Sequence, residues 1–204
     1  MDRDHFDNIT KVIEQPDVMF DIGVATMNTE GWWASQTWKG IEIFGFEPCE
    51  RRFRELYNYP GNLKKMAVTD KVGKFNGQMN NYDFKIKAEE DKNDPYIDVV
   101  VESTTIDELD SIHGPFDKIF IWADIEGGEL TLLKGAEKVL KEKRVIGINL
   151  ELFSTPPVEG WPVPEETIEY LKQFDYHISF GERGSYEDWD RKSQQDFLFL
   201  PKKD

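Results

Sequence analysis

Two carboxylates and a pair of glycines follow a short apolar segment in the middle of the chain. Asp124 and Glu126 come directly after the run from Lys118 to Ala123, Gly127-Gly128 follow, and Glu129 opens a helical pattern. In an open α/β sheet, ligands lie in the crevice outside the carboxyl ends of the strands. Asp124 and Glu126 are therefore expected beside a ligand, where they could bind a charged cofactor, coordinate a hard cation or act as a general base. For Glu129 we favour a structural role, as negative charge in the first turn of a helix.

Two earlier segments have the same form, an apolar run that ends in an acidic residue. Asp21 is followed closely by Gly23, whose missing Cβ lets the backbone approach a ligand. The G-x-G-x-x-G fingerprint is absent there, so a pyrophosphate site is not expected. Glu47, before Pro48, ends the next run, where an acidic side chain can accept hydrogen bonds from both ribose hydroxyls. The pattern favours a nucleoside cofactor without phosphates, and an acidic rim suits a sulfonium nucleoside. Glu151, near the end of a later run, either lines the same crevice or faces solvent.

The order of elements predicts an α/β fold with a mainly parallel sheet, because strand-like and helix-like segments alternate for most of the chain. Strands are expected at residues 18–22, 42–47, 63–69, 118–123, 145–152, 176–180 and 196–200. Helices are expected at residues 4–14, 50–57, 105–109, 129–140 and 165–174, and the tryptophan-rich segment after the first strand is a helix or a structured loop. The last two strands have no helix between them, so we expect an antiparallel pair at the edge of the sheet.

Residues 71–103 interrupt this alternation. Gly73, Gly77 and Asn80-Asn81 punctuate short β-like stretches, and residues 96–101 are strongly strand-like. We interpret the segment as a β-rich insertion, with residues 87–94 as an exposed loop. Acceptor specificity is expected from this insertion and from the loops around Trp161 and Trp189.

Composition bounds the classes of partner. The 204 residues suit one domain, spanning residues 1–204. The formal net charge of −15 disfavours nucleic-acid backbones and anionic membrane surfaces, so neither partner is expected. The sequence has no apolar run of membrane-spanning length and no secretory h-region, and a cytoplasmic location is expected. Cys49 is the single cysteine, which excludes an internal disulfide and a cysteine-based zinc site.

Six segments together resemble the FkbM-like family of S-adenosylmethionine-dependent methyltransferases. They are Phe20-Asp21-Ile22-Gly23, Gly45-Phe46-Glu47-Pro48, Ala67-Val68-Thr69-Asp70 with Gly73, Thr105-Ile106-Asp107-Glu108-Leu109, Asp124-Ile125-Glu126-Gly127-Gly128-Glu129 with Leu133-Lys134-Gly135-Ala136, and Asn149-Leu150-Glu151. Their order and spacing span roughly residues 18–153, and the fifth segment is the most specific.

The resemblance implies a seven-stranded, Rossmann-like class I methyltransferase sheet with a reversed last strand. It implies that Asp21 and Gly23 line the methionine part of S-adenosylmethionine, while Glu47, followed by Pro48, holds the ribose. The segment from Ala67 to Asp70 would lie by the adenine. Asp124 and Glu126 would face the transferred methyl group. The family commonly methylates hydroxyl groups, so a small-molecule or glycan acceptor is expected.

Three alternatives remain open at the level of sequence. Ala25 and Met27 stand where the family motif has an Asn and a second glycine, and a non-catalytic binding module on the same fold would explain them. A divalent metal held by Asp124 and Glu126 could activate the acceptor hydroxyl. A metal-dependent hydrolase is the weakest alternative, because no histidines have metal-ligand spacing.

Overall fold

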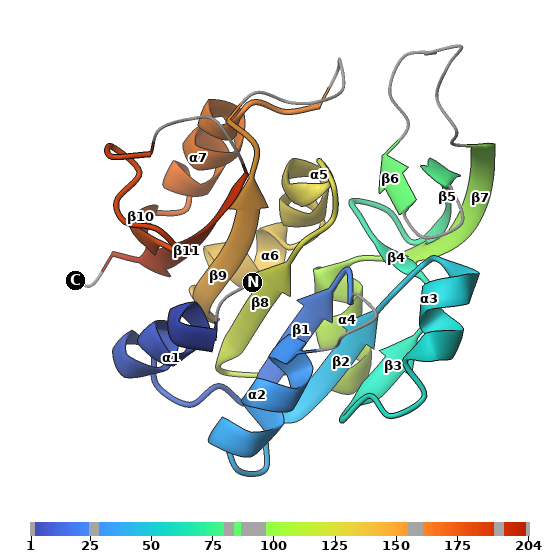
Figure 1. Ribbon diagram of the computed structural model, residues 1–204, viewed down its shortest axis with the longest axis horizontal. Helices are drawn as coiled ribbons and strands as arrows, with labels where there is room; N and C mark the ends of the chain where they lie inside the picture. Colours follow the sequence, from blue (N-terminus) through green and yellow to red (C-terminus); the bar gives the residue numbers. More distant parts are fainter. Residues whose placement is uncertain are drawn as a thin grey trace.

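The computed structural model describes residues 3–24, 29–79, 84–86, 97–154, 161–189 and 194–202. Seven strands form the main sheet, in the order β10-β11-β9-β8-β1-β2-β3 (Figure 1). Their bounds are β1 (Val18–Ile22), β2 (Glu42–Phe46), β3 (Asn62–Lys64), β8 (Ile119–Ala123), β9 (Val145–Leu152), β10 (Tyr176–Gly181) and β11 (Gln195–Pro201). The strands from β9 to β3 pair in parallel, and β11 is antiparallel to both of its neighbours. The predicted α/β fold with a reversed last strand is confirmed.

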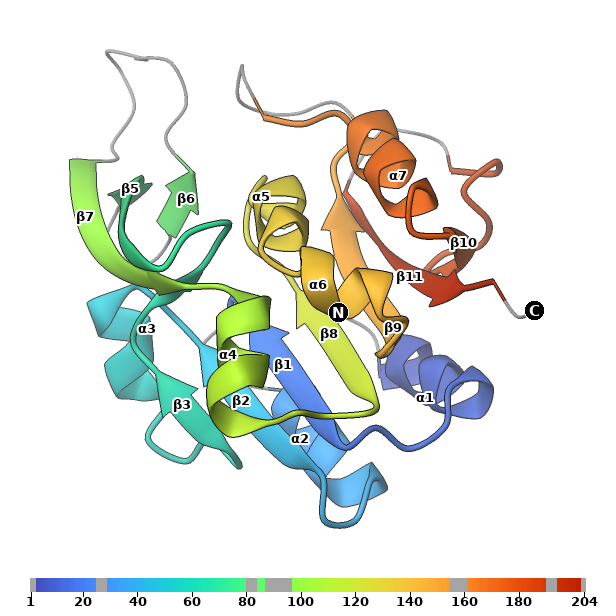
Figure 2. The ribbon, with the colours of Figure 1, turned by 180° about the vertical axis from the view of Figure 1, so that it is seen from behind.

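Helices cover both faces of the main sheet (Figures 1 and 2). One face carries α1 (Arg3–Val12) and α2 (Thr29–Thr37). The other carries α4 (Ile106–His113), α5 (Glu129–Lys134), α6 (Glu137–Lys141) and α7 (Pro164–Lys172). Because both faces are covered, β1 and β8 are buried along their whole length. No helix within the described ranges is long and apolar enough to cross a membrane.

Backbone hydrogen bonds join the carboxyl ends of the central strands. Ile22 lies opposite Ala123 in the register of β1 and β8, and the Asp124 N–H donates to the Ile22 carbonyl at 3.0 Å. The Gly23 N–H donates to the Phe46 carbonyl at 2.9 Å. The chain order reverses at β1, which is the point where open α/β sheets bind ligands.

The strand predicted at residues 63–69 is wrong. The chain forms β3 and then β4 (Ala67–Val68), and these two strands belong to different sheets. β3 pairs with β2, whereas β4 pairs with β7 (Ile97–Thr104), so the chain changes partners between them. With β5 (Gly73–Met79) and β6 (Phe84–Ile86), β4 and β7 form a small sheet in the order β4-β7-β5-β6. The β-rich insertion is thus present, and its predicted loop at 87–94 lies outside the described residues.

The single helix predicted at residues 129–140 is also wrong, because it is divided into α5 and α6. A Cβ on Gly135 would lie 2.0 Å from the carbonyl oxygen of Thr69, so the glycine lets the chain pass close to the small sheet. α6 then starts under a side-chain cap. The Asp107 carboxylate accepts from the N–H groups of Lys138 and Val139 at 2.9 and 3.1 Å.

Candidate active site

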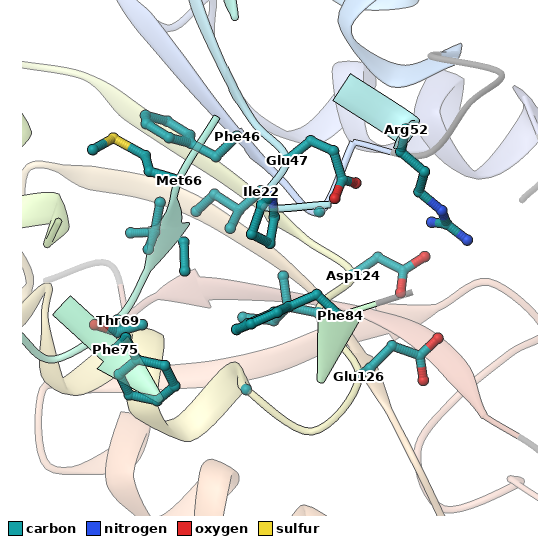
Figure 3. A pocket seen from close by; sticks show the side chains of 16 residues that line it. Ile22, Phe46, Glu47, Arg52, Met66, Thr69, Phe75, Phe84, Asp124 and Glu126 are labelled. Carbon is teal, nitrogen blue, oxygen red and sulfur yellow. The ribbon is translucent and has the colours of Figure 1, made fainter. Parts of the chain in front are cut away.

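A cavity of about 210 Å³ opens at the carboxyl ends of β1, β2 and β8. Its lining has two sides of different chemistry (Figure 3). The apolar side carries Phe46, Met66, Phe75 and Phe84, and the charged side carries Glu47, Arg52, Asp124 and Glu126. The main sheet supplies the carboxylates through its strand ends, while Phe75 and Phe84 come from the small sheet.

Gly23 lines the cavity, and its lack of a side chain has a reason that the sequence did not reveal. Its φ is +84°, and a Cβ there would lie 1.9 Å from the carbonyl oxygen of Asp124. The glycine therefore allows the ends of β1 and β8 to touch. This packing brings the backbones after the two strands to the same wall of the cavity.

Glu47 is almost fully buried, at 3% exposure, and its carboxylate is held in place by the following turn. The Cys49 N–H donates to Oε1 of Glu47 at 2.7 Å. Pro48 fixes the backbone between them and also lines the cavity. The turn therefore pre-organises Glu47 at the wall.

Asp21 lies next to the cavity but is not part of its lining. Its Oδ2 accepts a hydrogen bond of 2.7 Å from the Tyr59 hydroxyl. Burial, with a further contribution from the charge of Glu30, raises the pKa of Asp21 to about 8. The Tyr59 side chain fills the space above Gly45 and Gly31, where a Cβ would lie 2.5 Å from the ring and 2.9 Å from the hydroxyl oxygen, respectively. Tyr59 was not singled out from the sequence. The glycine at position 45, in the Gly-Phe-Glu-Pro segment, is the residue that leaves room for its ring.

The turn after β8 directs Glu126 to the cavity. Glu126 and Gly127 have φ values of 51° and 83°, so two consecutive residues are in the left-handed region. A Cβ on Gly127 would lie 2.2 Å from the Trp161 ring, which in turn packs edge-on against Phe153. Trp161, expected near the acceptor, thus lies directly against this turn.

Asp124, directly after β8, interacts with Glu151 of the neighbouring strand β9. Burial raises the pKa of Asp124, and a hydrogen bond with Glu151 opposes this effect. Burial and the charge of Asp124 raise the pKa of Glu151 to about 10. Two carboxyl groups can share a hydrogen bond only when one of them is protonated. The half-buried Glu151 is therefore the protonated partner, and it does not simply face solvent.

Two more buried carboxyl groups lie behind the cavity. Burial raises the pKa of Glu129 to about 8 and that of Asp196 to about 7. Glu129 stands in the first turn of α5, as predicted, but its Oε1 has no hydrogen-bond partner among the described residues, so burial of this carboxyl has a cost that the sequence did not indicate. Asp196 accepts from Asn149 at 2.8 Å, and Asn149 contacts His5 at 2.9 Å, which places His5 in a buried polar chain away from the cavity.

The segment after β3 contributes unevenly. Ala67 and Thr69 line the cavity, whereas Asp70 is exposed and is not in the lining. Phe75, Phe84 and Arg52 were missed from the sequence, because nothing in their neighbours indicates that they face the strand ends.

Within the described ranges, no group of three or more His, Cys, Asp or Glu residues is arranged to hold a metal ion, so the divalent-metal alternative has no support.

The comparisons with known proteins agree with this arrangement. The family model of the methyltransferase FkbM domain matches residues 21–178. The chain belongs to this family. The FkbM match contains every predicted site residue, from Asp21 to Glu126. No curated protein matches the chain significantly.

Several solved structures similar to this FkbM-domain chain are described as methyltransferases. The precorrin-6y C5,15-methyltransferase from Geobacter metallireducens GS-15 is 13% identical, with a TM-score of 0.51 over 97% of this chain and 87% of that chain. The human methyltransferase 10 domain containing protein is 11% identical, with a TM-score of 0.48 over 98% and 80% of the two chains. The m1A22 tRNA methyltransferase TrmK of B. subtilis is 12% identical, with a TM-score of 0.47 over 96% and 64%. At such identities the Geobacter structure supports the fold alone, which is that of the class I, S-adenosylmethionine-dependent enzymes.

Proposed function

We propose that this protein transfers a methyl group from S-adenosylmethionine to a hydroxyl group of a small molecule or glycan. The observation that carries the proposal is the convergence of Gly23, Glu47 and Asp124 on one cavity with an apolar side and a charged side. Membership of the FkbM family supplies the reaction class.

The two sides of the cavity fit the two ends of the cofactor. Phe46, Met66 and Ala67 offer apolar contacts to an adenine ring. Glu47, fixed through Oε1 by the Cys49 N–H, can accept hydrogen bonds from the ribose hydroxyls with its remaining lone pairs. Asp124 lies where the positively charged methionine end would extend. When bound, S-adenosylmethionine supplies an electrophilic methyl group.

The residues beyond the cofactor position would handle the acceptor. Methyl transfer is an in-line displacement, so holding the acceptor oxygen in place is the main contribution of the protein. As the new oxygen–carbon bond forms and the sulfur–carbon bond breaks, the hydroxyl proton must leave. Glu126, which lines the cavity, is the proposed proton acceptor, and Asp124 would position the reacting groups. The net charge of −15 favours a small molecule or glycan over a nucleic-acid backbone.

The test is a transfer assay with a tritium-labelled methyl donor and a panel of acceptors. The panel contains sugars, oligosaccharides, phenols, amines and RNA. Label on a hydroxyl acceptor is expected, and Glu126→Gln should lower turnover by about 10²- to 10⁴-fold while S-adenosylhomocysteine still binds. Glu137→Gln, at an exposed glutamate that pairs with Lys141, is the matched control.

Three outcomes would change the proposal. Transfer to amines or RNA alone would refute the hydroxyl acceptor. Near-normal turnover by Glu126→Gln would refute the base. Failure of the folded protein to bind either cofactor form would favour the non-catalytic module that Ala25 and Met27 suggest; both residues lie outside the described ranges.

A further inference from the structure

Three arginines occupy α3 (Glu50–Glu55), and one of them differs from the other two. Arg51 pairs with Glu55, and Arg54 pairs with Glu50. The side chains of Arg51 and Arg54 are 52% and 75% exposed, respectively. Arg52 instead lines the cavity. Figure 3 shows it reaching from α3 to the side of the cavity where the carboxylates of Glu47 and Asp124 lie.

The charges around the cavity are unbalanced. Among the described lining residues, Arg52 is the one cation, against the carboxylates Glu47, Asp124 and Glu126. The guanidinium is close enough to act on its neighbours, since its charge lowers the pKa of Asp124 against the effect of burial. Arg52 therefore has electrostatic interactions with the wall before any ligand enters.

The chemistry of the ligand selects a role for Arg52, and this step rests on the proposed function. The adenosine end of S-adenosylmethionine is uncharged, whereas the methionine end carries an ammonium, a sulfonium and a carboxylate. The wall carboxylates attract the first two groups and repel the third. A planar guanidinium matches a carboxylate with two parallel hydrogen bonds, which an ammonium or a sulfonium cannot accept.

We propose that Arg52 binds the carboxylate of the methionine moiety of the cofactor. In this arrangement the acidic wall selects the positive charges of the ligand, and Arg52 selects its one negative charge. Arg52 is then a specificity determinant for the amino-acid end of the cofactor. A guanidinium that only held Glu47 and Asp124 in place would be indifferent to that end of the ligand.

Ligands with and without the carboxylate separate these roles. Calorimetry would compare S-adenosylhomocysteine, its decarboxylated analogue and 5′-methylthioadenosine on the wild-type protein and on Arg52→Gln. The variant should bind S-adenosylhomocysteine about 10- to 100-fold more weakly, the range expected for a charge-assisted pair. It should bind the two ligands without a carboxylate within about twofold of wild type, or more tightly for the cationic analogue, because a repulsive charge has been removed.

A second arginine of the same helix provides the control. Arg51→Gln removes an equal charge from the surface and should leave all three affinities unchanged. Arg52→Lys keeps the positive charge but cannot form two parallel hydrogen bonds. Its affinity for S-adenosylhomocysteine should lie between those of the wild type and Arg52→Gln. Equal losses for all three ligands in both Arg52 variants would refute the carboxylate contact. Failure of the wild-type protein to bind S-adenosylhomocysteine would instead refute the proposed function.

Discussion

The two sides of the cavity differ in origin, because the carboxylates of the charged side follow strands of the main sheet, whereas the apolar side adds rings of the small sheet to Phe46 of β2. The ends of the main sheet carry carboxyl groups, whereas the small sheet offers the aromatic rings of Phe75 and Phe84. Parallel strands covered by helices on both faces hold a charged group rigidly, and they also remove it from water. The partly exposed strands of the small sheet impose no such cost on the apolar rings that they carry.

The pKa values show the cost on the main-sheet side. Burial raises the pKa of Asp21 to about 8, that of Glu129 to about 8 and that of Glu151 to about 10. Asp21 and Glu151 lie near the ends of β1 and β9, and Glu129 is the first residue of α5, after the turn that follows β8. The comparison predicts that the charged side governs charge-dependent binding, that the buried carboxyl groups around it govern pH-dependent stability, and that the apolar side governs affinity alone.

The first prediction from this comparison is a large loss of affinity on the apolar side. Replacing Phe75 and Phe84 together by alanine should weaken S-adenosylhomocysteine and 5′-methylthioadenosine alike, by about 10- to 100-fold. Each buried aromatic ring contributes about 1.5–3 kcal/mol when fully covered, and the rings here would be covered only in part. Calorimetry measures both affinities. Val100→Ala, at an exposed position of β7, is the control. A loss of affinity for S-adenosylhomocysteine alone would contradict the assignment of charge-independent affinity to the apolar side.

The next effect concerns pH. A carboxyl group whose folded pKa lies above its unfolded value favours the protonated folded state, so its stabilising contribution is complete below about pH 4 and is lost as pH rises. With folded pKa values of about 8 for Asp21 and Glu129 and about 10 for Glu151, the free energy of unfolding should fall between pH 6 and pH 9.

Glu129→Gln sharpens this test, because the amide is neutral at every pH. The variant should raise the free energy of unfolding at pH 8 by about 1–3 kcal/mol and flatten its decline with pH. Urea unfolding at pH 6 and pH 9 measures both quantities. The alanine pair on the small sheet should leave the pH slope as it is in the wild-type protein. An unchanged slope in Glu129→Gln would show that burial of this carboxyl has no cost.

The smallest effect is expected at Tyr59. Tyr59→Phe removes the hydrogen bond to Asp21 and should lower the free energy of unfolding by about 1–2 kcal/mol, with cofactor affinity changed less than about threefold. Tyr57→Phe, at a side chain that is 84% exposed, is the matched control. A large loss of affinity in Tyr59→Phe would mean that Asp21 contributes to binding directly.

The sequence was sufficient where structure depends on local pattern. The apolar run 18–22 is β1 as predicted. Thr105 caps α4 by accepting from the Glu108 N–H at 3.0 Å, and the spacing of Thr105 and Glu108 in the sequence is that of a capping box. Glu47 and Asp124 could be placed at strand ends because acidic residues follow short apolar runs. These features need only neighbours in the chain.

The remainder depends on contacts between distant segments. The break between β3 and β4 follows from pairing with β2 and β7, and the break at Gly135 follows from contact with Thr69. Neither partner is visible from the local pattern. For the same reason, the sequence does not distinguish Arg52, which lines the cavity, from the other two arginines of α3.

The most direct measurement is a calorimetric titration of the purified protein with S-adenosylmethionine and S-adenosylhomocysteine, beside Glu47→Ala and the exposed control Glu55→Ala. Micromolar binding is expected for the wild type and for Glu55→Ala. Glu47→Ala should bind about 100-fold more weakly or not at all, because it loses the charge-assisted hydrogen bonds proposed to the ribose. Wild-type affinity in Glu47→Ala, or no binding by the intact protein, would contradict the placement of the cofactor in this cavity.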